Sequence, residues 1–396
     1  MKRGFGAAAF ALVLGACVAE VGEPVPVVKW PLPVVGTVYV PLDPPYEPSL
    51  NELRAKLTAS QVESYLRRLA PMVAGRSLRA EEIEQIARQG GAALPAIIEG
   101  WTREEGFVLM AREWISTRLK ASGKRGDLNL ELPGNLAAYL ARNGLPHSEL
   151  LTADYCIDDA GRKAPCDTGA PYAAGVLTTR AFLSNNASRF NLKRARTMLR
   201  TFACKDYPLP LTEQPPLERA VLIPLFQQDK VEGSASGTFG NGFACYTCHS
   251  QFGAHAQPFV KFNQDGRWIA AATGRQVEGG EQGRSVDGLF TSHMIDPMVS
   301  SSEASQVFGK PVQNLAGVAE AFATSSAFWT CSVGGLLGFA FGLPESTVFT
   351  LPPDVLEDVV MAAKAKQPRP SLALLAIEAF SHPAVVRSFE GPRQSP

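Results

Sequence analysis

Cys245-Tyr246-Thr247-Cys248-His249 is the stretch of this 396-residue chain from which its architecture is best inferred. It has the pattern C-x-x-C-H. Two thiols three positions apart on a helical turn can each bond one vinyl group of a single porphyrin, and the adjacent histidine can then face the iron. The motif therefore predicts one covalently attached haem c, held by Cys245 and Cys248, with His249 as the proximal iron ligand.

Three other interpretations of the motif fit less well. A redox-active Cys-x-x-Cys pair is expected within a thioredoxin-like βαβ pattern, which the flanking sequence does not have. A zinc site requires a second pair of ligands, and none has suitable spacing. A local disulfide would leave the histidine without a role. Haem attachment is the interpretation that uses all three side chains.

The sixth iron ligand determines what such a haem can do, since an electron carrier usually has a second strong ligand, often methionine. Candidates follow the motif in an irregular segment, 291–298, where Met298 and Met294 are favoured. A histidine (His255 or His293) and an open iron position are the alternatives. We interpret Met361, on an apolar helix, as a core residue, and His147 and His382 as surface-loop residues beside prolines.

The N-terminus resembles an export signal. Lys2 and Arg3 precede an apolar run over 7–14, and Leu-Gly-Ala then leads to Cys17. This arrangement is typical of a bacterial lipoprotein signal, in which Cys17 is lipidated and becomes the first residue of the mature protein; an ordinary cleaved signal is the alternative. Val18 is not acidic, which favours the outer membrane. The apolar run is shorter than the ~20 residues that a membrane-spanning helix needs.

Export predicts an oxidising environment, in which free thiols are disfavoured. Once Cys17 and the two motif cysteines are assigned, four of the 7 cysteines remain, and four cysteines allow three pairings. Cys156 and Cys166 lie in one loop, so a bridge between them costs little closure entropy. Cys204 and Cys331 would then join a basic helix to a C-terminal helix.

Hydrophobic periodicity predicts a mainly α-helical, multi-module protein with long loops. Val62, Tyr65, Leu66 and Leu69 follow the i, i+3, i+4, i+7 pattern of a helix that packs on one face. Further helices are expected over 134–143, 190–204, 312–343, 354–366 and 371–380. The 190–204 helix is strongly basic, which we interpret as a solvated face, and the apolar stretch 326–343 as a closely packed core helix.

Residue composition and proline-rich stretches divide the chain into five predicted parts. The 38 basic and 38 acidic residues balance, so nothing indicates a nucleic-acid partner. Proline-rich residues 17–48 are interpreted as an extended tether. The predicted parts are a signal peptide (1–16), the lipidated tether (17–48), a helical N-terminal module (49–172), a haem-bearing cytochrome c-like module (173–290) and a C-terminal helical module (291–396).

Several segments, taken in order, resemble the multi-module family of exported c-type haem proteins associated with planctomycete cytochromes, whose modules have no assigned function. The similar segments are 65–69 with 77–82, 150–155, 175–183, 204–210, Cys248-His249 with 262–263 and 266–268, and 318–322 with Ser326, Phe328, Cys331 and Gly342. The resemblance implies haem, export and a mostly α fold. One departure is Phe252-Gly253-Ala254, where the family pattern has Met-Asp-Pro.

These observations favour a membrane-anchored, exported monohaem cytochrome that exchanges electrons with a redox partner protein of unknown identity. A haem enzyme acting on peroxide or a small gas is the first alternative and would need an open iron position. A lipoprotein scaffold with a structural haem is the second. An electron carrier is preferred because no acid–base pair for haem catalysis can be identified in the sequence.

Overall fold

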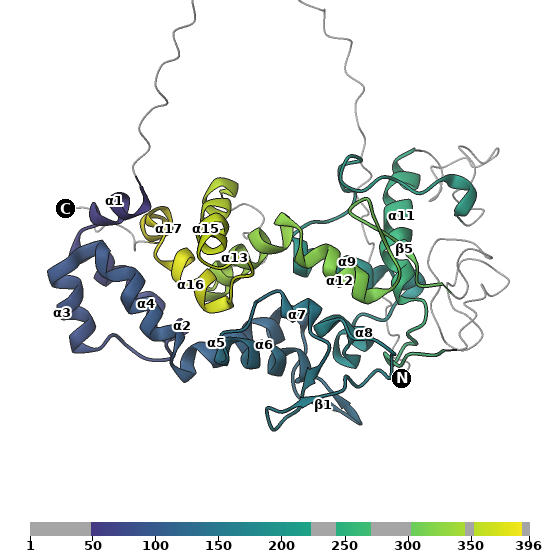
Figure 1. The fold of residues 1–396 in the computed structure, drawn as a ribbon, viewed down its shortest axis with the longest axis horizontal. Helices are drawn as coiled ribbons and strands as arrows, with labels where there is room; N and C mark the ends of the chain where they lie inside the picture. Colours follow the sequence, from purple (N-terminus) through teal and green to yellow (C-terminus); the bar gives the residue numbers. More distant parts are fainter. Residues whose placement is uncertain (1–48, 223–242, 271–301, 345–351, 390–396) are drawn as a thin grey trace, which may run out of the picture. The chain divides into compact units, whose positions relative to one another are not determined.

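The computed structural model describes residues 49–222, 243–270, 302–344 and 352–389, and these are mainly α-helical (Figure 1). The predicted fold class is confirmed. Strands within these ranges form only short antiparallel pairs. The pairs are β1 (Lys124–Arg125) with β2 (Leu128–Asn129), β3 (Cys156–Ile157) with β4 (Lys163–Ala164), and β5 (Ser305–Val307) with β6 (Lys310–Val312).

Helices are found in the predicted ranges 134–143, 190–204, 354–366 and 371–380, and further helices lie between them. The N-terminal ones are α1 (Leu50–Ala55), α2 (Ala59–Val73), α3 (Ala80–Gln89), α4 (Leu94–Thr102), α5 (Glu105–Leu119), α6 (Leu132–Arg142) and α7 (Glu149–Thr152). The central ones are α8 (Arg180–Asn185), α9 (Leu192–Ala203) and α11 (Phe243–Ala256). The C-terminal ones are α12 (Leu315–Ala323), α13 (Ser326–Ala340), α15 (Pro353–Lys366), α16 (Leu372–Phe380) and α17 (Pro383–Ser388). Short 3-10 turns are η1 (Gly90–Ala93), η2 (Gly175–Thr178), η3 (Arg189–Asn191), η4 (Arg219–Val221) and η5 (Gln257–Phe259).

One hydrophobic core extends through the described residues. Its members come from α2 to α7, from α8 and α9, and from α12 to α17, so all three predicted modules contribute to it. The described chain from residue 49 onward belongs to one compact unit. The module boundaries at 172 and 290 therefore stay predictions about sequence organisation.

The single helix predicted over 312–343 is wrong: the structure has two. Ser325 accepts a hydrogen bond from the Phe328 amide and caps α13, which separates it from α12. α13 is buried along most of its length and packs against α9, α15 and α16, as expected of a core helix. Within the described ranges, no helix combines the length and apolarity that a membrane crossing requires.

Three expectations about single side chains are also wrong. His147 and His382 are 3% and 5% exposed, so neither is a surface residue. His147 is stacked between the rings of Trp114 and Phe328, and His382 caps α17. Met361, expected in the core, is 61% exposed because it faces away from the packed side of α15. Proline neighbours mark turns, and these turns are covered by other parts of the chain.

A buried ion pair attaches α1 to the C-terminal helices. The Arg54 guanidinium donates to the Ser381 carbonyl at 2.8 Å and contacts a Glu378 carboxylate oxygen at 3.3 Å. Lys366 pairs with the other oxygen of Glu378. The first helix after residue 48 is thus held to α16 by charged hydrogen bonds, which are stronger than neutral ones.

Candidate functional site

The C-x-x-C-H motif lies entirely within α11. Residues three apart on a helix lie on the same face, so the backbone places positions 245 and 248 one turn apart. Cys248 and His249 are both partly exposed, whereas the neighbouring Ser250 is buried. The motif therefore lies where α11 leaves the core. The side chain of Cys245 lies outside the described residues, as do Cys17, His293, Met294 and Met298.

His249 lies beside aromatic rings. Its ring centroid is 5.7 Å from that of Phe252, which in turn lies 3.7 Å from that of Tyr207. Burial lowers the pKa of His249 to about 4. The imidazole is therefore neutral near pH 7, which is the form that binds a metal.

The second half of α11 is fixed by buried polar side chains. Gln251 donates to the carbonyls of Leu209 and Gln214 at 3.0 and 2.8 Å and accepts from the Leu209 amide at 2.8 Å. These three bonds use both N–H donors and the oxygen of the amide group. They tie the helix to the proline-rich loop that follows α9, which fixes the position of the helix that carries the motif.

His255 is the centre of this polar network. The Tyr207 hydroxyl lies 2.6 Å from its Nδ1, and the side-chain oxygen of Gln214 lies 3.0 Å from its Nε2. Since the amide oxygen can only accept, Nε2 donates to Gln214 and Nδ1 accepts from Tyr207. Burial lowers the pKa of His255 to about 3. Both ring nitrogens are engaged, so His255 is not available as an iron ligand in this structure.

The basic helix α9 does not simply present a solvated face, contrary to expectation. The Arg194 guanidinium is fully buried and donates to the carbonyls of Leu183 at 2.9 Å and Phe262 at 2.7 Å, and also to Asn263. Burial lowers its pKa to about 9. Arg194 thus joins α9 to the segment that follows α11, where backbone carbonyls solvate its charge in place of water.

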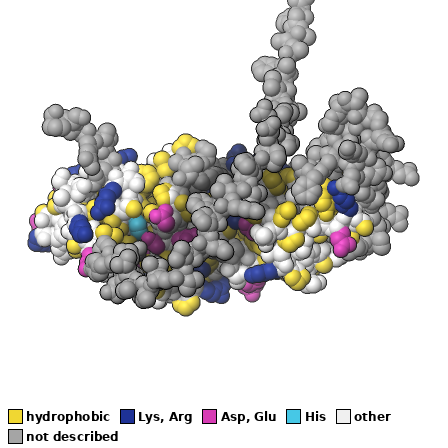
Figure 2. Space-filling view, turned by 90° about the horizontal axis from the view of Figure 1, so that it is seen from above, with side chains coloured by type: hydrophobic (Ala, Val, Ile, Leu, Met, Phe, Trp, Pro, Cys, Tyr) yellow, Lys and Arg dark blue, Asp and Glu magenta, His cyan; other side chains and the backbone are white. Residues whose placement is uncertain are grey.

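The exposed side of α9 lies near the motif. Arg196 donates to both carboxylate oxygens of Asp206, at 2.9 and 2.6 Å, and its positive charge lies close to Cys248. Arg200 donates to the same carboxylate at 3.2 Å. Two guanidinium groups therefore share one carboxylate beside the motif. The face of the molecule drawn in Figure 2 shows charged side chains of both signs interspersed with hydrophobic ones.

Comparison with protein-family models, with curated proteins and with solved structures finds no match to this chain. Within the described ranges, no three His, Cys, Asp or Glu side chains come together as a site for a metal ion. The chemistry of the motif thus rests on its own residues. They fit a covalent haem: the two cysteine positions share one helical face, a neutral imidazole follows, and aromatic rings line its surroundings.

Two disulfides join the four remaining cysteines, in the pairing that the sequence favours. Cys156 and Cys166 have Cα atoms 4.9 Å apart, and those of Cys204 and Cys331 are 5.2 Å apart. The first bridges the β3–β4 hairpin, and the second joins the end of α9 to α13. The sequence does not indicate Tyr207, Gln214 and Gln251 as a group, because Gln251 lies about 40 positions after the other two and no spacing pattern links them.

Proposed function

We propose that the protein is an exported, lipid-anchored monohaem c-type cytochrome that transfers electrons. The observation that carries this proposal is the C-x-x-C-H motif on a single helix, with His249 neutral and at the edge of the core. Cys245 and Cys248 would hold the haem by thioether bonds, and His249 would bind the iron. The haem would supply one-electron redox chemistry.

The surrounding residues have a positioning role in this proposal. Gln251, His255 and Gln214 hold α11 to its neighbouring loop, and Arg194 holds α9 to the segment after α11. A rigid support keeps the His249 ring in one orientation, and such outer contacts tune a metal ligand. The partly exposed basic side chains of Arg196 and Arg200 support a redox partner with an acidic docking surface, because complementary charge speeds encounter.

The test of haem binding is the visible spectrum of the purified protein, produced with the c-type maturation machinery, in the reduced state with and without carbon monoxide. An unchanged low-spin spectrum is expected, because an electron carrier has both axial positions filled. In that case Met294→Ala and Met298→Ala identify the sixth ligand by which variant becomes able to bind carbon monoxide. A carbonyl spectrum of the unmodified protein would overturn electron transfer in favour of peroxide or gas chemistry.

Anchoring is tested separately at Cys17. Several acyl chains on one terminus hold a protein stably at a membrane. The native chain is expected in the outer-membrane fraction after separation of bacterial membranes, and the Cys17→Ala variant in the soluble or precursor fraction. Equal distribution of both forms would overturn the lipid anchor without affecting the haem proposal.

A further inference from the structure

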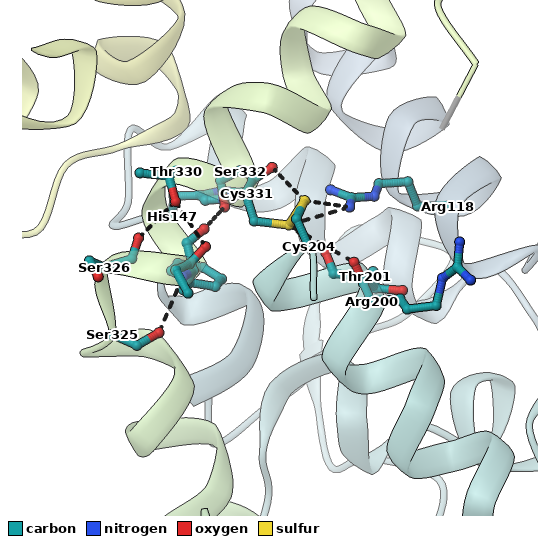
Figure 3. The surroundings of a disulfide bond; sticks show 12 residues. Arg118, His147, Arg200, Thr201, Cys204, Ser325, Ser326, Thr330, Cys331 and Ser332 are labelled. Carbon is teal, nitrogen blue, oxygen red and sulfur yellow. Dashed lines mark hydrogen bonds between the residues drawn. A yellow bond between two sulfur atoms is a disulfide. The ribbon is translucent and has the colours of Figure 1, made fainter. Parts of the chain in front are cut away.

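The Cys204–Cys331 disulfide has a cation against both of its sulfur atoms. A terminal guanidinium nitrogen of Arg118, on α5, lies 3.5 Å from the Cys331 sulfur and 3.7 Å from the Cys204 sulfur (Figure 3). The three residues come from α5, α9 and α13, so the arrangement depends on the tertiary fold. A disulfide is uncharged, and an adjacent guanidinium gives it no ionic stabilisation.

A glycine on α13 leaves room for the Arg118 side chain. A Cβ atom added to Gly335 would collide with the Arg118 guanidinium and crowd the Trp114 ring. Gly335 lies one helical turn after Cys331, which leaves the space through which the arginine side chain reaches the sulfurs. The glycine thus makes the contact possible.

The two sulfurs differ in accessibility. Cys331 is 3% exposed, while Cys204, at the end of α9, is partly exposed. The Cys331 sulfur is also the nearer of the two to the Arg118 guanidinium nitrogen, at 3.5 Å against 3.7 Å. An attacking thiolate would therefore reach Cys204 first, and Cys331 would be the leaving group.

We propose that Cys204 and Cys331 form a thiol–disulfide exchange site in which Arg118 stabilises the reduced, thiolate form. The co-reactant is a dithiol reductant. One of its thiolates attacks the Cys204 sulfur, which breaks the bond to Cys331 and releases a thiolate beside Arg118. The second thiol of the reductant then attacks the mixed disulfide and frees Cys204. Two electrons pass to the protein, in which one sulfur stays a thiolate beside Arg118 and the other becomes a thiol, and the reductant becomes a disulfide with release of one proton to solvent.

Opening this bond would release the end of α9 from α13. Cys204 directly precedes the loop that contains Tyr207, Leu209 and Gln214, whose contacts hold the second half of α11. Reduction would therefore loosen the support of the helix that carries the C-x-x-C-H motif. The exchange itself does not depend on haem, so its test is independent of the test of the proposed function.

The test is a redox titration of the mature full-length protein with dithiothreitol, followed by alkylation and quantification of the peptide that contains each cysteine. In Arg118→Met the equilibrium constant for reduction of Cys204–Cys331 is expected to fall about tenfold, which is about 30 mV for this two-electron couple. The Cys156–Cys166 bond is the internal reference and should not change. Arg118→Lys should restore part of the effect.

Arg112→Met is the matched control, because Arg112 lies on the same helix and pairs with Glu131 at 2.9 Å, away from the sulfurs. It should leave both equilibria unchanged. An equal constant for Arg118→Met and the native chain would overturn the proposal. If Arg118→Met does not fold, the pH dependence of alkylation of Cys204 and of Cys331 in the reduced native protein decides. The lower of the two midpoints should lie below the value of about 8.5 for a free thiol, and two midpoints at or above that value would overturn the proposal.

Discussion

The two halves of α11 have opposite surroundings. The half that contains Cys248 and His249 lies at the edge of the core, whereas the half that contains Gln251 and His255 is buried in polar contacts. Six positions separate the two histidines, and burial lowers the pKa of both, to about 4 and about 3. A low pKa therefore does not distinguish a ligand from an anchor. The contacts of both ring nitrogens identify His255 as an anchor.

The largest expected effect is the loss of covalent haem when residues in the first half of α11 are replaced. Cys245→Ala combined with Cys248→Ala removes both thioether bonds, so covalent haem should be lost completely. Denaturing gels stained for haem, with protein produced under c-type maturation, measure this. Cys156→Ala with Cys166→Ala is the control, because it removes two cysteines away from α11 and should keep the haem. Haem that survives in the first variant would contradict the assignment.

Substitution in the second half of α11 is expected to lower the unfolding free energy of the protein. His255→Ala removes the partner of Tyr207 and Gln214 and leaves a cavity, which is expected to cost about 3 kcal/mol or more of unfolding free energy. Urea denaturation followed by far-UV circular dichroism measures the loss in protein without haem. His249→Ala, at the partly exposed end, should cost clearly less. The reverse order would show that the two halves have been assigned the wrong roles.

The pH dependence of stability sharpens the contrast. The pKa of His255 is about 3 in the folded protein, against an ordinary value of 6.5, so below pH 6.5 the unfolded chain binds a proton that the folded chain does not. The contribution of His255 to the unfolding free energy is therefore fully present above pH 6.5 and is lost as the pH decreases toward 3. From pH 7 to pH 5 the His255 contribution is about 2 kcal/mol. His255→Ala should flatten the measured slope by this amount, and an unchanged slope would contradict it.

A smaller effect isolates one hydrogen bond. Tyr207→Phe keeps the ring beside Phe252 but removes the hydroxyl that donates to His255. Leaving a buried acceptor without its donor costs about 1–3 kcal/mol. Tyr139→Phe, which keeps its edge-on contact with Tyr155, is the matched control and should stay within about 0.5 kcal/mol. Equal unfolding free energies for the two variants would show that the Tyr207 hydroxyl is not part of the support.

The sequence predicts the local features of this molecule well and the distant contacts poorly. Amphipathic spacing predicts α2, and the four cysteines left after the motif suggest the pairing that the structure contains. The burial of Arg194 could not be predicted, because its acceptors are carbonyl groups, which every residue has. His255 illustrates the same limit, since its partners are defined only once the loop after α9 folds against α11.

The ion pair at Arg54 also determines where mechanical load enters the molecule. Any pull on residues 1–48 acts first on α1, and the Arg54 contacts with Ser381 and Glu378 pass it to α16. α11 takes no part in these contacts. Tension applied at α1 is therefore passed directly to the C-terminal helices through these contacts, and not to the helix that carries Cys248 and His249.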